Sequence, residues 1–125
     1  MQFTVNWSEP KKFQADNFSE INFDGIYMIG YRKEGTNGRH PVYFGQGYIS
    51  TRLVNHFENN AKVLAKIRAN GIGYYRFAKC SNESDRLDIE LGLYRKYGGK
   101  EKLCNEIDPP GTDRYSEVSV IEVYP

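Results

Sequence analysis

Residues 23–31 and 41–45 are rich in aromatic and β-branched side chains, and the polar stretch KEGTNGRH separates the two segments. Side chains of these types favour strands. The Asn37-Gly38 pair inside the polar stretch is typical of a tight hairpin turn. The sequence therefore predicts two neighbouring antiparallel strands, and a sheet built around this hairpin is the starting point for the rest of the fold.

Two helices are predicted after the hairpin. Apolar residues recur at helical spacing over 53–57, and Ser50 or Thr51 can cap the start of that helix. A second helix carries the apolar residues of 63–67 and stops at Asn70-Gly71. Both segments have a polar side as well as an apolar one, so we expect them to pack on the sheet.

The remaining segments complete an α+β pattern. Residues 2–7, 74–80 and 117–124 alternate or are rich in aromatic side chains, so each is predicted as a strand. Residues 81–99 begin with cap-forming polar side chains and end at a Gly-Gly pair, as helices do. The order predicts a small three-stranded, mostly antiparallel sheet flanked by helices, to which both chain ends can add strands. We expect residues 1–125 to form one domain.

Composition narrows the class of protein and its surroundings. Hydrophobic residues make up 39% and charged residues 26% of the chain, as in a folded globular domain. The formal net charge of +1 argues against a broadly basic surface, although a local basic stripe is compatible with it. Cys80 and Cys104 are too few for a disulfide framework, and two histidines give no zinc-ligand spacing. Because the first twenty residues also lack an apolar run, we expect a cytoplasmic protein without a membrane span.

Glu90 is the most unusual residue of the third predicted helix. At about 100° per residue it projects near the centre of an apolar arc, whereas Asp88, Arg95 and Lys96 point away from it. The arc consists of Leu87, Leu91, Leu93, Tyr94 and Tyr97. A carboxylate in such a place needs a cation, a metal or a hydrogen-bond donor. Two interpretations stay open: a structural ion pair with Arg52 or a half-exposed face, and a metal ligand at the bottom of a cleft.

Arg52 and His56 form a second polar pair on the first predicted helix. They lie four residues apart, so they share a face and can reach one ligand. The planar guanidinium suits a phosphate, and an imidazole beside it can accept or relay a proton. The same spacing is also typical of a solvated helix face, with His56 as a boundary residue.

Short tripeptides and single polar residues also follow one another in a fixed order: GIY at 25–27, YFG at 43–45, Arg52, His56, Glu90 and Asn105. In this combination they resemble the GIY-YIG endonuclease family. The resemblance covers the chain from about Asp24 to Asn105, and the second tripeptide reads YFG where the family pattern is YIG. It implies a stand-alone nuclease domain that hydrolyses phosphodiester bonds in DNA.

The resemblance implies a role for each matched side chain. Tyr27 is the implied general base that takes a proton from the attacking water, with Tyr43 and His56 supporting it or relaying the proton. Arg52 would bind the phosphate and stabilise its charge, and Glu90 would hold one Mg²⁺ or Mn²⁺ ion. Because a phenol has a pKa near 10, we expect neighbouring cations to lower the pKa of the base.

Other residues are implied to organise the site and bind DNA. Gly25 and Gly45 would let the backbone run close to the sheet and leave room beside the tyrosines, and Asn105 would organise the site rather than take part in the chemistry. A basic surface on the second predicted helix can contact a DNA backbone through Lys62, Lys66 and Arg68. Family members often carry a separate DNA-binding domain, so specificity here would come from a homodimer, a partner protein or the structure of the DNA.

Two other classes of protein compete with the nuclease. One is a noncatalytic GIY-YIG-like module that binds nucleic acid or protein, which loss of the tyrosine, arginine or glutamate would have favoured. The other is a small α+β interaction protein in which Glu90 and Arg52 pair directly and no open cleft exists. The arrangement of these side chains in space distinguishes the second alternative from the nuclease.

Overall fold

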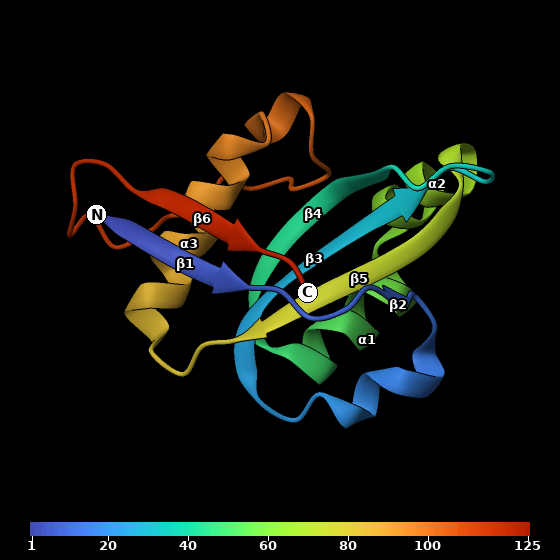
Figure 1. The fold of residues 1–125 in the computed structure, drawn as a ribbon, viewed down its shortest axis with the longest axis horizontal. Coiled ribbons are helices and arrows are strands. Elements are labelled where there is room, and N and C mark those ends of the chain that lie inside the picture. Colours follow the sequence, from blue (N-terminus) through green and yellow to red (C-terminus); the bar gives the residue numbers. More distant parts are fainter.

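A computed structural model describes residues 1–125, and its main feature is a four-stranded antiparallel sheet with the strand order β2-β5-β3-β4 (Figure 1). These strands are β2 (Lys11–Lys12), β3 (Asp24–Arg32), β4 (Arg39–Tyr48) and β5 (Ile72–Lys79). The three long strands are those expected from the sequence, and the short edge strand β2 is an addition to them. The α+β class is confirmed, with four strands in the main sheet instead of three.

The β3–β4 hairpin is confirmed, but its tight turn is not at Asn37-Gly38. The chain turns at Lys33 to Thr36, where the Thr36 amide and hydroxyl both donate to the Lys33 carbonyl oxygen, at 3.1 and 2.9 Å. Gly35 supplies the positive φ, 78°, that this turn requires. Gly38 stays at ordinary φ, so the Asn-Gly pair forms only the last part of a six-residue loop, and the prediction of its turn was wrong.

Helices α1 (Ile49–Asn59), α2 (Ala61–Asn70) and α3 (Glu83–Lys96) complete the fold together with the 3-10 helices η1 (Ala15–Glu20) and η2 (Gly99–Glu101). Asparagine caps define two of the starts, since the side chains of Asn60 and Asn82 accept from the amides of Val63 and Asp85. Gly71 follows α2 as expected. None of these helices is both long and apolar enough to cross a membrane.

The predicted cap of α1 was wrong, because the helix begins at Ile49 and neither Ser50 nor Thr51 caps it. The helix follows β4 directly, and its first amides find backbone partners outside the helix. The Ile49 amide donates to the Phe23 carbonyl at 3.1 Å, and the Ser50 amide donates to the Ile21 carbonyl at 3.2 Å. These bonds replace a side-chain cap.

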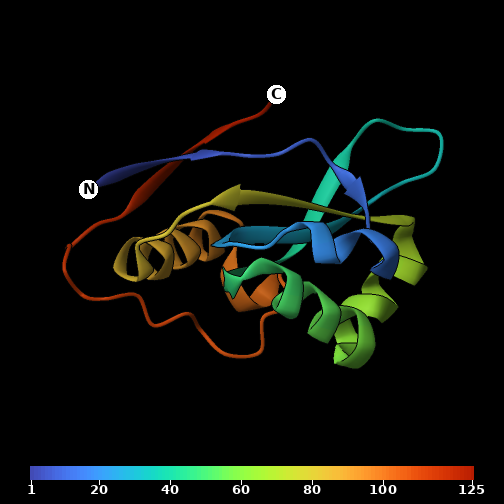
Figure 2. The same ribbon diagram turned by 90° about the horizontal axis from the view of Figure 1, so that it is seen from below.

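The two ends of the chain form a sheet of their own. β1 (Gln2–Asn6) and β6 (Ser119–Val123) pair in parallel, with Gln2 opposite Ser119, so both expected end strands exist but neither joins the main sheet. In Figure 2 this pair runs along one side of the main sheet, and α1 and α2 lie along the other. The main sheet is therefore covered on both faces.

Side chains of β3 alternate between two apolar cores, one on each side of the main sheet. Ile26 and Met28 belong to the core that includes residues of α3, β1 and β6. Tyr27 and Ile29 belong to the core that includes residues of α1 and α2. This alternation, which follows from the two-residue period of a strand, directs Tyr27 towards α1.

Candidate active site

Tyr27 of β3 meets His56 of α1 in the interior of the protein. The hydroxyl oxygen of Tyr27 lies 2.7 Å from Nε2 of His56, and both side chains are buried, with 2% and 7% of their surface exposed. Burial and, to a smaller extent, the positive charge of Arg52 lower the pKa of His56 to about 4, so the imidazole is neutral near pH 7. The sequence-predicted tyrosine and histidine are thus in direct contact.

Asn60 determines which atom donates in this contact. Its Oδ1 accepts from the Val63 amide at 3.1 Å, so the atom facing Nδ1 of His56 at 2.9 Å is the amide nitrogen Nδ2. An amide nitrogen can only donate, and Nδ1 is therefore an acceptor. In a neutral imidazole the hydrogen then sits on Nε2, and Nε2–H donates to the oxygen of Tyr27. Sequence reasoning missed Asn60, although its place as cap of α2 one turn after His56 was a signal for it.

Tyr43 of β4 stacks on the same group. Its ring lies 6.2 Å from that of Tyr27, with 13° between the planes, and 4.2 Å from the ring of His56. Tyr43 and His56 line a cleft of about 580 Å³, which we call the tyrosine cleft. Its other lining residues include Asn55, Asn59, Asn60, Lys62 and Glu106. An open cleft therefore exists beside the predicted site, lined by Tyr43 and His56 but not by Tyr27, Arg52 or Glu90.

Glu90 and Arg52 do not form the ion pair that one interpretation required. The structure contains three ion pairs, and neither residue takes part in any of them. Glu90 is half-buried, and burial raises its pKa to about 7, opposed by the positive charge of Arg52. The same two charges act on Tyr27 and Tyr43, which places all four side chains within electrostatic range.

The pKa values of both tyrosines are raised and not lowered by their surroundings. Burial raises the pKa of Tyr27 well above 10, and the charges of Tyr43 and Glu90 raise it further, while Arg52 lowers it. Burial likewise raises the pKa of Tyr43. The expected lowering of the phenol pKa is therefore not provided by the protein's own cations, because desolvation outweighs the single arginine.

The matched glycines have different structural roles. A side-chain carbon on Gly45 would overlap the hydroxyl and ring of Tyr27, so this glycine provides the space that the tyrosine occupies. Gly25, in contrast, packs against the backbone of Ala78 on β5, which agrees with the expected close approach of the backbone to the sheet but not with a role in leaving room beside a tyrosine. Gly47, with φ of 130°, lies under Arg52, where an added carbon would come 2.9 Å from Nε of the arginine.

Asn105 joins the segment after η2 to β4. The buried amide donates from Nδ2 to the Phe44 carbonyl at 2.8 Å and accepts from the Phe44 amide at 3.3 Å. It thereby pairs with both backbone groups of the residue between Tyr43 and Gly45, much as another strand would. This position agrees with an organising role and offers no contact to the cleft.

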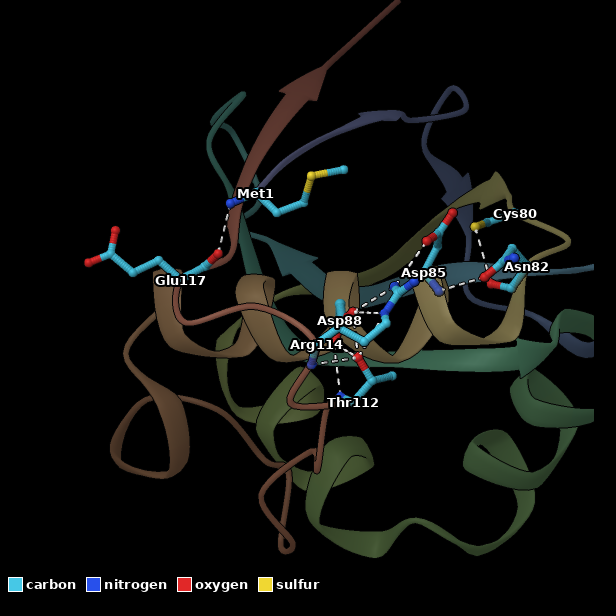
Figure 3. Close-up of polar contacts among 8 residues, drawn as sticks. All are labelled: Met1, Cys80, Asn82, Asp85, Asp88, Thr112, Arg114 and Glu117. Carbon is cyan, nitrogen blue, oxygen red and sulfur yellow. Dashed lines mark hydrogen bonds and ion pairs between the residues drawn. The ribbon is translucent and has the colours of Figure 1, made fainter.

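Asp88 is buried, with 2% exposure, although it was predicted to point away from the apolar arc of its helix. Figure 3 shows the reason: Thr112 and Arg114 of the C-terminal segment converge on its carboxylate. The Thr112 amide donates to Oδ1 at 2.9 Å, and the Arg114 guanidinium donates to Oδ2 at 2.7 and 3.1 Å. Burial acts to raise the pKa of Asp88, but these bonds outweigh it and hold that pKa below its usual value. The C-terminal segment covers this charge and supplies its partners, whereas Arg95 and Lys96 are exposed as expected.

The predicted basic residues of α2 separate into two positions. Lys62 and Lys66 line a hollow of about 500 Å³ together with Lys100 and Lys102, which we call the lysine hollow. Arg68 is exposed but does not line it. The lysine hollow and the tyrosine cleft share Lys62 and Cys104, so they adjoin. Sequence reasoning missed Lys100 and Lys102, because nothing in their spacing indicates that they meet α2.

Comparison of the chain with protein-family models, with curated proteins and with solved structures gives no match in any of the three. No group of three or more His, Cys, Asp and Glu side chains is arranged to hold a metal ion. A metal at Glu90 would therefore have at most two such protein ligands and take its remaining ligands from water and substrate, which is a common arrangement for Mg²⁺.

Proposed function

We propose that the protein is a metal-dependent endonuclease of the GIY-YIG type that hydrolyses phosphodiester bonds in DNA. The observation that carries the proposal is the hydrogen bond between Tyr27 and His56, since it joins two of the matched side chains beside Tyr43. The charges of Arg52 and Glu90 act on the same tyrosines. Side chains from β3, β4, α1 and α3 thus form one electrostatically coupled group.

In the proposed mechanism Tyr27 reacts as the phenolate: its hydroxyl proton is first lost to solvent, and the phenolate oxygen then takes the proton of the attacking water, which restores the neutral phenol. His56 supports this role as a donor: its Nε2–H points to the tyrosine oxygen and stabilises negative charge there. The same bond means that Nε2 has no free lone pair, so His56 does not take the tyrosine's proton in this tautomer. The exposed guanidinium of Arg52 binds the nonbridging phosphate oxygens.

Glu90 fits the role of a single-carboxylate metal ligand. Its side chain is half-buried, has no ion pair and makes no hydrogen bond to another side chain, so its charge lacks a partner within the protein. A divalent cation bound there supplies positive charge that polarises the phosphate and stabilises the leaving oxygen. A carboxylate with a pKa of about 7 loses its proton readily in exchange for such an ion.

The two adjoining depressions support a path for the nucleic acid. The tyrosine cleft carries Tyr43 and His56, and the lysine hollow continues from it across Lys62 to Lys66, Lys100 and Lys102. Lysines spaced along a groove neutralise successive phosphates and make binding dependent on salt. We therefore place the DNA backbone on the lysines and the scissile phosphate beside Tyr43.

The test is cleavage of plasmid, branched and single-stranded DNA with Mg²⁺ or Mn²⁺. The native chain is compared with Glu90→Gln and with Glu83→Gln, a control that removes an exposed carboxylate from the first turn of the same helix. Metal-dependent cutting by the native chain and the control, lost in Glu90→Gln, is the expected result. Absence of cutting with retained DNA binding would instead support the noncatalytic binding module.

A further inference from the structure

A second depression lies at the hairpin end of the main sheet and shares no lining residue with the tyrosine cleft or the lysine hollow. It has a volume of about 330 Å³ and is formed by β2, the end of β3, the start of β4 and the start of β5 (Figure 1). We call it the basic pocket, and its lining residues are Pro10, Lys11, Lys12, Arg32, Arg39, Ile72, Gly73 and Tyr74.

Every charged residue that lines the basic pocket is a cation. Lys11, Lys12, Arg32 and Arg39 contribute four positive charges in a chain whose formal net charge is +1. None of the four takes part in any of the three ion pairs of the structure. The mutual repulsion of these charges is thus not offset by a carboxylate within 4 Å.

The register of the sheet brings two of these charges face to face. Arg32 of β3 is the direct partner of Arg39 of β4 in the antiparallel pair. Like charges directly opposite one another destabilise a sheet. The pairing therefore has no explanation in the stability of the hairpin, whereas an anion held between the two guanidinium groups would relieve it.

Both arginines are held by contacts with neutral groups. Nη1 of Arg32 donates to the carbonyl of Thr36 at 3.0 Å, which ties it to the hairpin loop. The guanidinium of Arg39 lies 5.8 Å from the ring centre of Tyr74, a buried side chain of the pocket. Neither contact neutralises the positive charge, so the two guanidinium groups are held in position and are still able to bind an anion.

We propose that the basic pocket binds a phosphate group. Arginine presents paired N–H donors that match the oxygens of a phosphate, and the two lysines add charge from the edge strand. A volume of about 330 Å³ is at the small end of ligand pockets and holds a phosphate with a small group attached. The phosphate belongs either to the backbone of a nucleic acid or to a free phosphorylated compound.

The first test uses the native protein and inorganic pyrophosphate without divalent metal, followed by NMR of the backbone amides. We expect saturable shifts at Arg32, Arg39 and Gly73, with none at Gly45 or His56. Absence of saturable binding, or shifts of similar size over the whole surface, would overturn the proposal. Because no cleavage is measured, this result is independent of the proposed nuclease.

The second test compares the double variant Arg32→Gln/Arg39→Gln with Lys79→Gln/Arg95→Gln, a control that removes the same charge from exposed positions on β5 and α3. We expect the first variant to bind pyrophosphate at least tenfold more weakly and the control to stay within twofold of the native chain. Equal weakening in both variants would show a general charge effect and overturn the proposal.

A short oligothymidylate distinguishes the two sources of the phosphate. If its affinity falls at least tenfold in Arg32→Gln/Arg39→Gln, the pocket binds a nucleic-acid backbone. If only pyrophosphate binding falls, the pocket serves a free phosphorylated compound. Each variant is checked by its thermal unfolding. If a variant does not fold, the amide shifts of the native chain alone decide whether the pocket binds phosphate.

Discussion

The Nε2–H of His56 donates to the hydroxyl oxygen of Tyr27 across 2.7 Å, and Asn60 fixes this direction by donating to the other ring nitrogen. A tyrosine that accepts this bond keeps its own O–H free for a different partner. The histidine therefore acts on the tyrosine as a fixed donor. It favours the phenolate form of a side chain whose pKa burial otherwise raises.

Replacement of Tyr27 by Phe removes the oxygen and leaves the buried Nε2–H without an acceptor. We expect DNA cleavage to fall by about 100-fold or more, because a general base contributes at least that much. The free energy of unfolding should also fall, by about 1 to 3 kcal/mol, through the unsatisfied donor. Tyr31→Phe is the matched control, since Tyr31 lies on the same face of β3 and its hydroxyl makes no hydrogen bond. Cleavage assays and urea unfolding measure the two effects, and equal cleavage by both variants would contradict the assigned role.

The tautomer of His56 is open to a direct test with Asn60→Asp. The aspartate still accepts from the Val63 amide and so caps α2, but it cannot donate to Nδ1. We expect the hydrogen to move to Nδ1, the pKa of His56 to rise from about 4, and cleavage to fall about tenfold or more. Nitrogen-15 NMR of the imidazole measures the tautomer and the pKa. Asn59→Asp adds the same charge to the same cleft and should leave the Nε2–H form in place.

Gly45 is expected to be intolerant of even one methyl group. In Gly45→Ala the new carbon would overlap the hydroxyl of Tyr27, which must then leave its position against His56. We expect a loss of about 1 to 3 kcal/mol in the free energy of unfolding, as for other overpacked interiors, together with loss of cleavage. Gly38→Ala, whose added carbon meets only an imidazole nitrogen at 3.7 Å, should be nearly neutral in urea unfolding. A stable and active Gly45→Ala variant would show that the tyrosine does not need this position.

Local signals were enough to predict much of the framework. The glycine after α2 and the polar, cap-forming start of α3 placed these ends, because such signals act within a single turn of chain, whereas the Asn60 cap of α2 was not recognised. The pairing of Tyr27 and Tyr43 on neighbouring strands followed from a short hairpin, even though the position of its turn did not. The alternation of side chains along each strand then brings both rings to the α1 side of the sheet, where they meet His56.

The features that could not be predicted depend on partners distant in the sequence. Asp88 is buried only because Arg114 and Thr112 return to it from the C-terminal segment. The parallel pairing of β1 with β6 joins the two ends of the chain, and no local pattern specifies it. The lysine hollow likewise depends on the approach of residues 100–102 to α2. The pKa of Glu90 could not be predicted from the sequence either, because helical spacing does not show that no cation lies within ion-pair distance of its carboxylate.

Glu90 should lower the stability of the folded chain at alkaline pH. Its pKa rises from 4.5 to about 7 on folding, so the folded state holds the proton more tightly. The stabilising contribution is complete below about pH 4.5 and is lost as the pH rises through 7. Glu90→Gln removes this dependence, and we expect it to exceed the native chain by about 2 to 3 kcal/mol in free energy of unfolding at pH 8 and to match it at pH 4.5.

Urea unfolding across this pH range measures the difference between the two chains. The opposite contribution of His56, whose pKa falls to about 4, is present in both and cancels in that difference. A divalent ion should raise the melting temperature of the native chain at pH 8 but not that of Glu90→Gln, because only a carboxylate exchanges its proton for the metal. Glu83→Gln should behave as the native chain in both experiments, since this carboxylate is exposed. Identical pH profiles for native and Glu90→Gln would mean that the buried charge is stabilised by a partner other than a metal.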